Sequence, residues 1–531
     1  MAKRGYQTIT IEKLFGGWIS SISGSGTTSL DASLEGADNQ YAQSTSISLF
    51  RLEKLGHIAP GEVMTAITDS SSFINSLPLN GDVASNSRAF FILQNSRVVR
   101  TDTDGIVTTD GTDIAIATTG HTNHTVEGTS YAPDLIIVRD AANPSNERIL
   151  YSWADGIDGD VGIMGTDFAA IDHDWYSTLS GTGTLSARVP LKLCQGPDGN
   201  IYITNGQYIA TASMSAGIAI TAATKSFRAL NLGAGWIAMG ITAYRSFVAI
   251  IGFKGTAGTT SLSRSQCRVW LWDGFNSEPN HIYDLPDNIA SGIFYDSLNL
   301  YAITSGRGNS TRLWKFNGMG FEEVFVSDIV VPDSPIGSAI LRSRQGSIEY
   351  YQNSLLFTWR TNEMYQYFAG GLHQRMILTT GTNATDCGML KNLYQKQLFA
   401  GALVSGINRV LYQNQFTQYY INADFRSKLY QLPYRSTIRR IKLYFSQFGA
   451  GASVLVSLFK DYDTLSIGGN TDLLNYTISN AQFGILRSHE IICNISDVNS
   501  FYLNVRFNHS AVTNTAAIIR KIEIDYEVVD V

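Results

Sequence analysis

Short apolar runs separated by turn-forming residues dominate this sequence. Phe247-Val-Ala-Ile-Ile-Gly-Phe is one of many such runs, and almost no segment sustains the 3.6-residue period of an amphipathic helix. Short apolar segments bounded by Gly, Asn, Asp and Ser are typical of β-strands. Charged residues make up only 16% of the chain, which also holds 48 glycines and 26 tyrosines. The pattern therefore predicts an all-β protein.

A loose internal repeat accounts for most of the chain. A tyrosine, a short polar turn and an apolar strand recur at Tyr244, Tyr295, Tyr351 and Tyr394. A second strand with aromatic residues follows, as in Arg268-Val-Trp-Leu-Trp-Asp-Gly-Phe. A period of about 40–50 residues is typical of propeller blades, and Asp-Gly and Asn-Gly suit the tight turns of hairpins. We predict a β-propeller of six or seven blades over residues 62–430.

The two ends of the chain differ from this repeat. Residues 431–531 alternate apolar and polar residues, as in Ile518-Ile-Arg-Lys-Ile-Glu-Ile-Asp-Tyr, which predicts an antiparallel β-sandwich. Residues 1–61 are small and polar with few apolar residues, and we expect an extended N-terminal arm there. Its expected anchors are Phe15, Trp18 and Tyr41. Such an arm either staples the propeller ring or reaches a neighbouring subunit.

Charge and cysteine spacing exclude several classes of partner. The formal net charge is −6, and no Lys/Arg cluster is longer than Arg439-Arg440, which disfavours nucleic acid as the principal ligand. The start of the chain does not resemble a secretory signal, and no apolar run is long enough to span a membrane, so we expect a soluble chain. Four scattered cysteines, with no paired spacing, are expected to be reduced, mostly buried thiols.

No catalytic motif stands out in the sequence. Metalloprotease, nucleophile-elbow, P-loop and dinucleotide signatures are not found, and the eight histidines are scattered. His121 and His124 share one polar segment but have no further candidate ligands nearby in the sequence. We therefore predict a non-enzymatic protein with no cofactor and no resident metal.

An acidic segment holds the only weak metal candidates, Asp155, Asp158 and Asp160. Carboxylates interspersed with glycines can wrap a calcium ion, but the spacing is not that of the twelve-residue calcium loop. A solvated Asp-Gly turn is the simpler interpretation. The same carboxylates, with Asp172, are also a conceivable glycosidase pair, because such enzymes use two carboxyl groups a few Å apart.

Aromatic residues beside amides suggest an interaction surface. Tyr412 and Tyr419 lie in the stretch Tyr-Gln-Asn-Gln-Phe-Thr-Gln-Tyr, whose composition suits stacking on sugar rings or packing at a protein interface. The alternative is that these tyrosines pack between blades.

The whole layout resembles virion structural proteins of tailed bacteriophages, particularly propeller-bearing tail and tail-tip components. The resemblance rests on Gly36-Ala-Asp-Asn-Gln-Tyr-Ala and Leu55-Gly-His-Ile-Ala-Pro-Gly at the entry to the propeller. It also rests on Leu313-Trp-Lys-Phe-Asn-Gly in the blades and on the final strands at Ile438 and Ile518. No catalytic residues transfer from this class.

The resemblance implies a structural role in the virion, with assembly in the cytoplasm of a host bacterium. Other tail proteins are the implied partners, in a homo-oligomeric ring of three or six copies. A host-surface receptor or glycan is a further possible partner, and no membrane insertion is implied. The choice between nozzle, baseplate and host-attachment part stays open. A carbohydrate-binding lectin and a glycoside hydrolase are the two rival functions.

Overall fold

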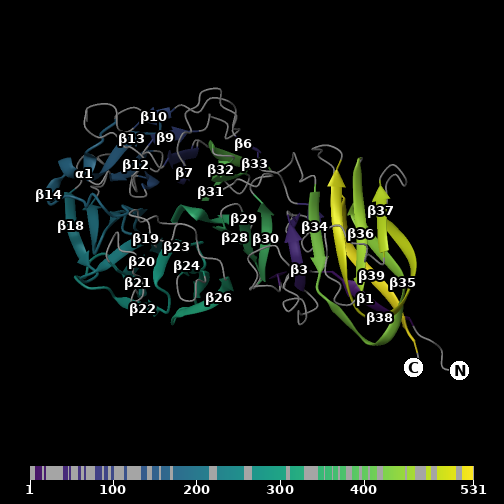
Figure 1. Cartoon of the computed structure of the whole chain (residues 1–531). Helices are drawn as coiled ribbons and strands as arrows, with labels where there is room; N and C mark the ends of the chain where they lie inside the picture. Colours follow the sequence, from purple (N-terminus) through teal and green to yellow (C-terminus); the bar gives the residue numbers. More distant parts are fainter. Residues whose placement is uncertain are drawn as a thin grey trace.

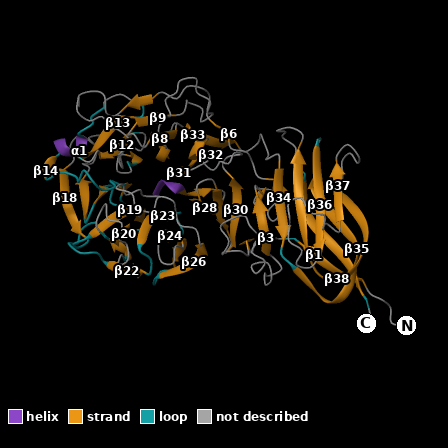
Figure 2. Ribbon diagram, viewed as in Figure 1, coloured by secondary structure: helices purple, strands orange, loops and turns teal. Residues whose placement is uncertain are grey.

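The structure is a computed structural model that describes residues 6–12, 14, 17–18, 40–45, 47–48, 58–60, 65–66, 78–85, 89–93, 97–100, 113–115, 133–139, 146–154, 157–167, 171–213, 224–255, 266–305, 311–327, 345–351, 353–360, 363–368, 371–377, 386–393, 397–404, 407–414, 422–448, 451–460, 474–479, 487–509 and 517–529. Strands dominate these residues (Figure 2). The predicted all-β class is confirmed. In this part of the chain, no helix has the length and apolar character needed to cross a lipid bilayer.

Seven antiparallel sheets form the propeller, which lies to the left in Figure 1. Blade 1 consists of β7 (Pro78–Val83), β8 (Ala89–Leu93), β9 (Arg97–Arg100) and β10 (Asp113–Ala115), and blade 2 of β11 (Leu135–Arg139), β12 (Glu147–Ala154) and β13 (Gly159–Gly165). Blade 3 consists of β15 (Leu193–Gln195), β16 (Ile201–Asn205), β17 (Tyr208–Ser213) and β18 (Thr224–Asn231). The short helix α1 (Trp175–Thr178) leads to β14 (Ser180–Thr182), which pairs parallel to β18.

The remaining blades each have four described strands. Blade 4 consists of β19 (Trp236–Tyr244), β20 (Phe247–Lys254), β21 (Cys267–Trp272) and β22 (His281–Leu285), and blade 5 of β23 (Ile289–Tyr295), β24 (Leu300–Ser305), β25 (Thr311–Phe316) and β26 (Phe321–Ser327). A 3₁₀ turn, η4 (Gln345–Ser347), precedes blade 6, which consists of β27 (Ile348–Tyr351), β28 (Ser354–Arg360), β29 (Glu363–Phe368) and β30 (Gly371–Ile377). Blade 7 consists of β31 (Asp386–Leu393), β32 (Gln397–Val404), β33 (Ile407–Asn414) and β6 (Thr65–Ala66).

The ring closes through a strand from the start of the chain. The first strand of each blade contacts the first strands of its two neighbours, and β31 of blade 7 contacts β7 of blade 1. β6 precedes blade 1 in sequence but pairs with β33 at the outer edge of blade 7. Both ends of the propeller are therefore held in one sheet, and the blade count is seven.

Burial on both faces explains the continuous apolar runs of the sequence. All six residues of β24 and six of the eight residues of β20 are buried, because each blade packs face to face against the next. A strand covered on both sides has no reason to alternate. The predicted buried thiols are found at Cys194, Cys267 and Cys493, which are free; burial raises the pKa of Cys493 to about 11.

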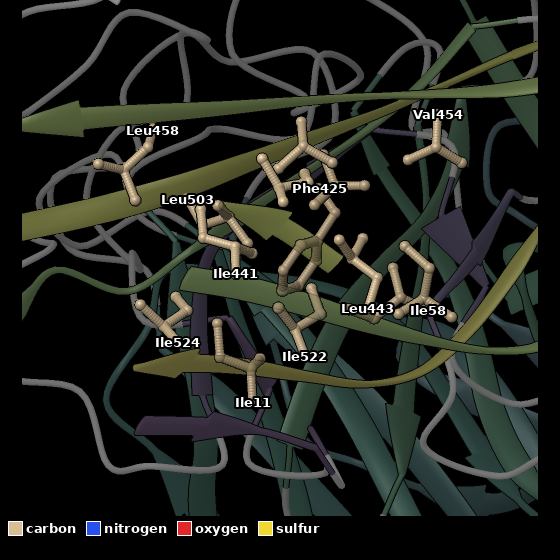
Figure 3. Packing of buried hydrophobic residues seen from close by; sticks show 14 of the residues in the cluster. Ile11, Ile58, Phe425, Ile441, Leu443, Val454, Leu458, Leu503, Ile522 and Ile524 are labelled. Carbon is tan, nitrogen blue, oxygen red and sulfur yellow. The ribbon is translucent and has the colours of Figure 1, made fainter. Parts of the chain in front are cut away.

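The C-terminal domain is a sandwich whose two layers share one long strand. Its strands are β34 (Asn422–Ser427), β35 (Tyr430–Gln447), β36 (Ala452–Lys460), β37 (Leu474–Ser479), β38 (Ser488–His509) and β39 (Ile518–Val528). The first half of β38 pairs with β35, and its second half lies between β34 and β36. The layers enclose one apolar core that includes Ile441, Ile524, Val454 and Leu503 (Figure 3).

The N-terminal arm is built into this sandwich. β1 (Tyr6–Ile11) pairs with β39 over its whole length, and β3 (Gln40–Thr45) pairs with β34. β2 (Gly17–Trp18) pairs with β3, while β4 (Ile47–Ser48) and β5 (Ala59–Pro60) pair with each other. Ile58, buried in the sandwich core, forms a bridge to Ile519. The extended arm thus docks on its own chain.

The structure moves one predicted domain boundary. A boundary after residue 430 assigns β34 to the propeller, but β34 pairs with β38 and contributes Phe425 to the sandwich core. The propeller therefore runs from β6 to β33 and is an insertion within the sandwich, between arm strands and β34. The residues of a six-residue strand do not indicate which strand it pairs with, so the local pattern of apolar and polar residues could not assign β34 to the sandwich.

Replacing Ile524, which is fully buried, with Ala tests the sandwich core. We expect Ile524→Ala to lower the free energy of unfolding by about 2–5 kcal/mol, because it removes buried methyl groups and leaves a cavity. Urea unfolding followed by fluorescence measures this. Ile492→Ala is the matched control, since Ile492 lies in β38 with 76% of its surface exposed, and a change there should stay within about 0.5 kcal/mol. Equal effects would contradict the assigned core.

Candidate functional site in the central channel

A cavity of about 260 Å³ lies at the centre of the propeller. Residues from β7, β11, β15, β19, β23, β27 and β31, the first strands of all seven blades, line it. Most of the lining is apolar or backbone, as at Ile241 and Phe294, but four charged side chains also reach it. These are Asp82, Asp134, Glu349 and Lys391.

Lys391 joins three blades at the point where the ring closes. Its Nζ lies 3.4 Å from Asp82 Oδ1 on β7 and 3.6 Å from Glu349 Oε2 on β27. Burial alone would lower the pKa of Lys391, but Asp82 and Glu349 outweigh it and raise this pKa. Burial raises the pKa of Glu349, and the nearby Lys391 partly opposes that shift. We call Asp82, Glu349 and Lys391 the closure triad.

A second polar group ties blades 1, 2 and 3 together. Asp134 accepts hydrogen bonds from Asn80 Nδ2 of β7 and, at 2.8 Å, from the Leu193 N–H of β15. Lys192 is buried, and its Nζ donates to the Pro133 carbonyl at 3.2 Å and lies 3.9 Å from Asp134 Oδ1. Burial lowers the pKa of Lys192. A buried lysine of this kind is tolerated because a carboxylate and a carbonyl face it.

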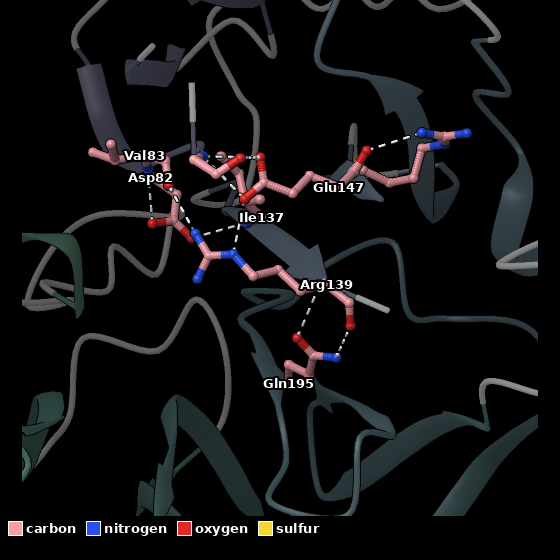
Figure 4. A network of polar contacts seen from close by, with 8 residues as sticks. Asp82, Val83, Ile137, Arg139, Glu147 and Gln195 are labelled. Atoms are coloured by element: carbon pink, nitrogen blue, oxygen red, sulfur yellow. Dashed lines mark hydrogen bonds and ion pairs between the residues drawn. The ribbon is translucent and has the colours of Figure 1, made fainter. Parts of the chain in front are cut away.

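Further polar contacts continue the connection between these blades (Figure 4). Arg139 Nε pairs with Glu147 Oε1 at 2.8 Å, and Glu147 accepts from the Ser85 N–H and hydroxyl. Asp82 Oδ2 accepts from the Ile137 N–H at 2.8 Å. The Gln195 amide exchanges two hydrogen bonds with the Arg139 backbone, at 3.1 and 3.3 Å.

These contacts define what the channel groups do. The Asp82, Asp134 and Glu147 carboxylates each accept hydrogen bonds from a neighbouring blade. Charge-assisted hydrogen bonds of this kind are stronger than neutral ones. Asp82 and Asp134, which line the cavity, and Glu147, which does not, therefore cross-link neighbouring blades.

The acidic segment proposed as a weak metal candidate lies in blade 2. Asp155 is outside the described residues, Asp158 is exposed, and Asp160 is buried in β13. Asp160 Oδ1 accepts from the Val161 N–H at 2.6 Å and the Ser177 N–H at 3.2 Å, while Asp172 Oδ1 accepts from the Asp174 N–H. Within the part of the chain that the structure describes, no three His, Cys, Asp or Glu side chains are grouped to hold a metal ion.

The predicted interaction residues fall in three places. Phe15 and Tyr419 lie outside the described residues. Trp18 of β2 is paired with Tyr41 of β3, so the structure brings these two together, and both strands contact β30 of blade 6. Tyr412 of β33 is paired with Thr65 of β6 and lies at the closing seam of the ring.

The residues that the sequence analysis missed are the charged members of the channel. Glu349 lies in the strand Ile-Glu-Tyr-Tyr, and Lys391 follows the apolar pair Met389-Leu390 in β31. A charge flanked by apolar residues in a strand is a signal that could have singled them out, because such a charge needs a partner when it is buried. The sequence could not say which residue that partner is.

Comparisons with known proteins identify no family. No protein-family profile and no curated protein matches the chain. Among solved structures, a chain of the mitotic checkpoint complex is 14% identical, with a TM-score of 0.42, over 65% of this chain and 92% of that chain. The Myceliophteria thermophila Cps50 (Swd1) β-propeller domain is 10% identical, with a TM-score of 0.42, over 66% of this chain and 99% of that one.

The computationally designed Ika8 protein is also 10% identical, with a TM-score of 0.37, over 66% of this chain and 100% of that chain. The three TM-scores are low, so the propeller assignment rests on the seven sheets and their closure.

Replacing Lys391 with Met tests the closure triad. Lys391→Met keeps most of the aliphatic stem but leaves the Asp82 and Glu349 carboxylates without their cation, and we expect a loss of about 3 kcal/mol in the free energy of unfolding. Urea unfolding measures it. Adding Glu349→Gln should recover part of the loss, and Lys254→Met at an exposed strand end is the control. A loss no larger than that of the control would show that the triad does not join the blades.

The buried Asp160 gives the protein a defined pH response. Burial raises the pKa of Asp160 to about 6, above its value in the unfolded chain, so the folded state binds the proton more tightly. The contribution of Asp160 to stability therefore falls as pH rises from about 4 to about 6, by up to roughly 2–3 kcal/mol. Urea unfolding at several pH values measures this.

Asp160→Asn should flatten that slope, because the amide oxygen still accepts both N–H groups and does not ionise. Asp158→Asn, at the exposed neighbour, is the control and should leave the profile as it is. An unchanged slope in Asp160→Asn would contradict the assignment.

Proposed function

We propose that this chain is a non-enzymatic structural component of a bacteriophage virion, in the tail or tail tip, that acts by packing against other proteins. The observation that carries the proposal is the construction of the chain as one braced unit. Arm strands β1 and β3 complete the sandwich, and β6 completes the propeller. A propeller inserted within a sandwich, with both of its ends held in sheets, suits a part that transmits force between neighbours.

The placement of the polar groups supports the same proposal. The carboxylates of the channel are engaged by neighbouring blades, which makes them supports of the ring and not free groups awaiting a substrate. The sequence resemblance supplies the virion context, and the low charge and free thiols are compatible with assembly in a bacterial cytoplasm. Among the described residues, no observation favours the lectin or the glycoside hydrolase over this role.

The solution mass of the purified full chain is the first test. We expect light scattering to show a ring of three or six copies, because virion parts repeat around a symmetry axis. A chain that lacks residues 1–60 is not a useful control for this measurement, because the deletion removes strands of the sandwich. A chain that stays monomeric at high concentration would contradict the self-assembled ring.

The virion assignment has its own test. Gold-labelled antibodies raised against the chain should decorate the tails of phage particles that carry this gene. Unlabelled particles, with the chain also missing from their protein composition, would overturn the assignment.

A further inference from the structure

Three turns in blades 4 and 5 share one construction. In each, the side-chain oxygen of an Asp or Asn accepts hydrogen bonds of 2.6–3.0 Å from the N–H groups of the second and third residues after it. The residue directly after the Asp or Asn has a positive φ, between 78° and 97°. The three turns are Asp273-Gly-Phe-Asn, Asp296-Ser-Leu-Asn and Asn317-Gly-Met-Gly.

Each turn presents a large apolar side chain to solvent. The third residue of each turn is Phe275, Leu298 or Met319, with exposed fractions of 80%, 70% and 90%. The hydrogen bonds of the turn hold the backbone at the third residue in one conformation. That conformation directs the side chain into solvent. Ser297 holds a positive φ without being a glycine, a conformation that costs energy for most residues. The same braced apolar tip thus recurs three times in two adjacent blades.

The three tips lie at the same end of their blades. The turn at Leu298 joins the first and second strands of blade 5, and that at Met319 joins the third and fourth. In an antiparallel four-stranded sheet these two turns lie at one end. The turn at Phe275 joins the third and fourth strands of blade 4, which lies beside blade 5 (Figure 1).

Aromatic rings connect the two blades at this end. The Tyr283 ring lies 5.1 Å from that of Phe316 and 5.9 Å from that of Phe321. The Tyr244 ring lies 5.1 Å from that of Tyr295. Tyr283, Tyr295 and Phe321 are only partly buried, so they add to the exposed apolar surface. We call the three turn tips, Phe275, Leu298 and Met319, together with the Tyr283, Tyr295 and Phe321 rings, the turn face.

Acidic residues outnumber basic ones along these turns and the adjoining strand ends, which we call the rim. The turns and adjoining strand ends carry four carboxylates, those of Asp273, Glu278, Asp296 and Glu322, against two cations, those of Arg245 and Lys315. Hydrogen bonds from the Asn276 and Phe275 N–H groups and the Asn280 amide lower the pKa of Asp273 to about 2. The Asp273 carboxylate is therefore charged at any physiological pH.

We propose that the turn face docks a protein segment that presents apolar side chains flanked by lysine or arginine. The proposal rests on the proposed function and names the chemistry of one partner in that assembly. Well-packed apolar side chains carry most of the energy at protein interfaces, and an acidic rim selects a basic partner and speeds its association. The negative rim disfavours an anionic lipid surface.

A surface-displayed library of random short peptides is the probe. Peptides are selected on the full-length chain, synthesised, and titrated against it by biolayer interferometry. We expect the dominant sequences to combine aromatic or aliphatic residues with Lys or Arg. Phe275→Ser/Leu298→Ser/Met319→Ser should weaken their binding about tenfold or more, because truncating the apolar side chains at the centre of an interface removes most of its binding energy. Thermal unfolding checks that this variant stays folded.

A matched variant isolates the effect of the site. Tyr434→Ser/Ile492→Ser removes apolar side chains that are 64% and 76% exposed on the sandwich, and it should leave peptide binding unchanged. Glu278→Gln/Glu322→Gln should weaken binding while the tips stay in place, with a smaller dependence on salt.

Selected peptides that are acidic, or that bind the tip variant as well as the wild type, would overturn the proposal. The proposal would also be overturned if the chain bound phosphatidylcholine vesicles or glycans but not basic peptides, and if the tip variant lost that binding. Antibody labelling of phage tails does not depend on the turn face. A negative result in the peptide experiments would therefore overturn this proposal without bearing on the virion assignment.

Discussion

Closure of the propeller ring is the constraint on which the rest of this structure depends. Each blade buries its faces only against its two neighbours, so an open seam would expose two sheet faces and their edges to solvent. Two separate interactions close the seam between blade 7 and blade 1. β6 adds the outer strand of blade 7, and the closure triad joins blades 6, 7 and 1 at the inner wall. Closing so long a loop costs little more entropy than closing a shorter one.

The sandwich extends this bracing to the rest of the chain. Because β1 and β3 come from before the propeller, and β34 to β39 from after it, the sandwich cannot be completed until both ends of the chain meet. The propeller is thereby held at its entry and at its exit. This arrangement explains why the polar N-terminal segment carries Ile11, Leu14 and Ile58, which all belong to the sandwich core.

The polar groups of the propeller divide into two kinds by their surroundings. Channel carboxylates such as Asp82 and Asp134 are used by the neighbouring blade, and they hold the ring in one shape. Asp273 and Asp296 instead accept hydrogen bonds within their own turns. They shape the solvent face that carries Phe275 and Leu298. The same residue type thus stabilises the ring in one place and displays an apolar surface in another.

Local sequence determined the class of fold, the blade texture and the turns of this protein. Apolar runs such as that at Phe247 and dipeptides such as Asp273-Gly274 act over a few residues, so the strands and turns that they favour can be recognised in the sequence alone. Only the tertiary structure decided that β34 belongs to the sandwich, that β6 closes blade 7, and that Lys391 faces Asp82 and Glu349. The physical reason is that strand pairing and charge pairing join residues far apart in the chain. A short strand fits many sheet edges equally well until the whole ring and sandwich select one.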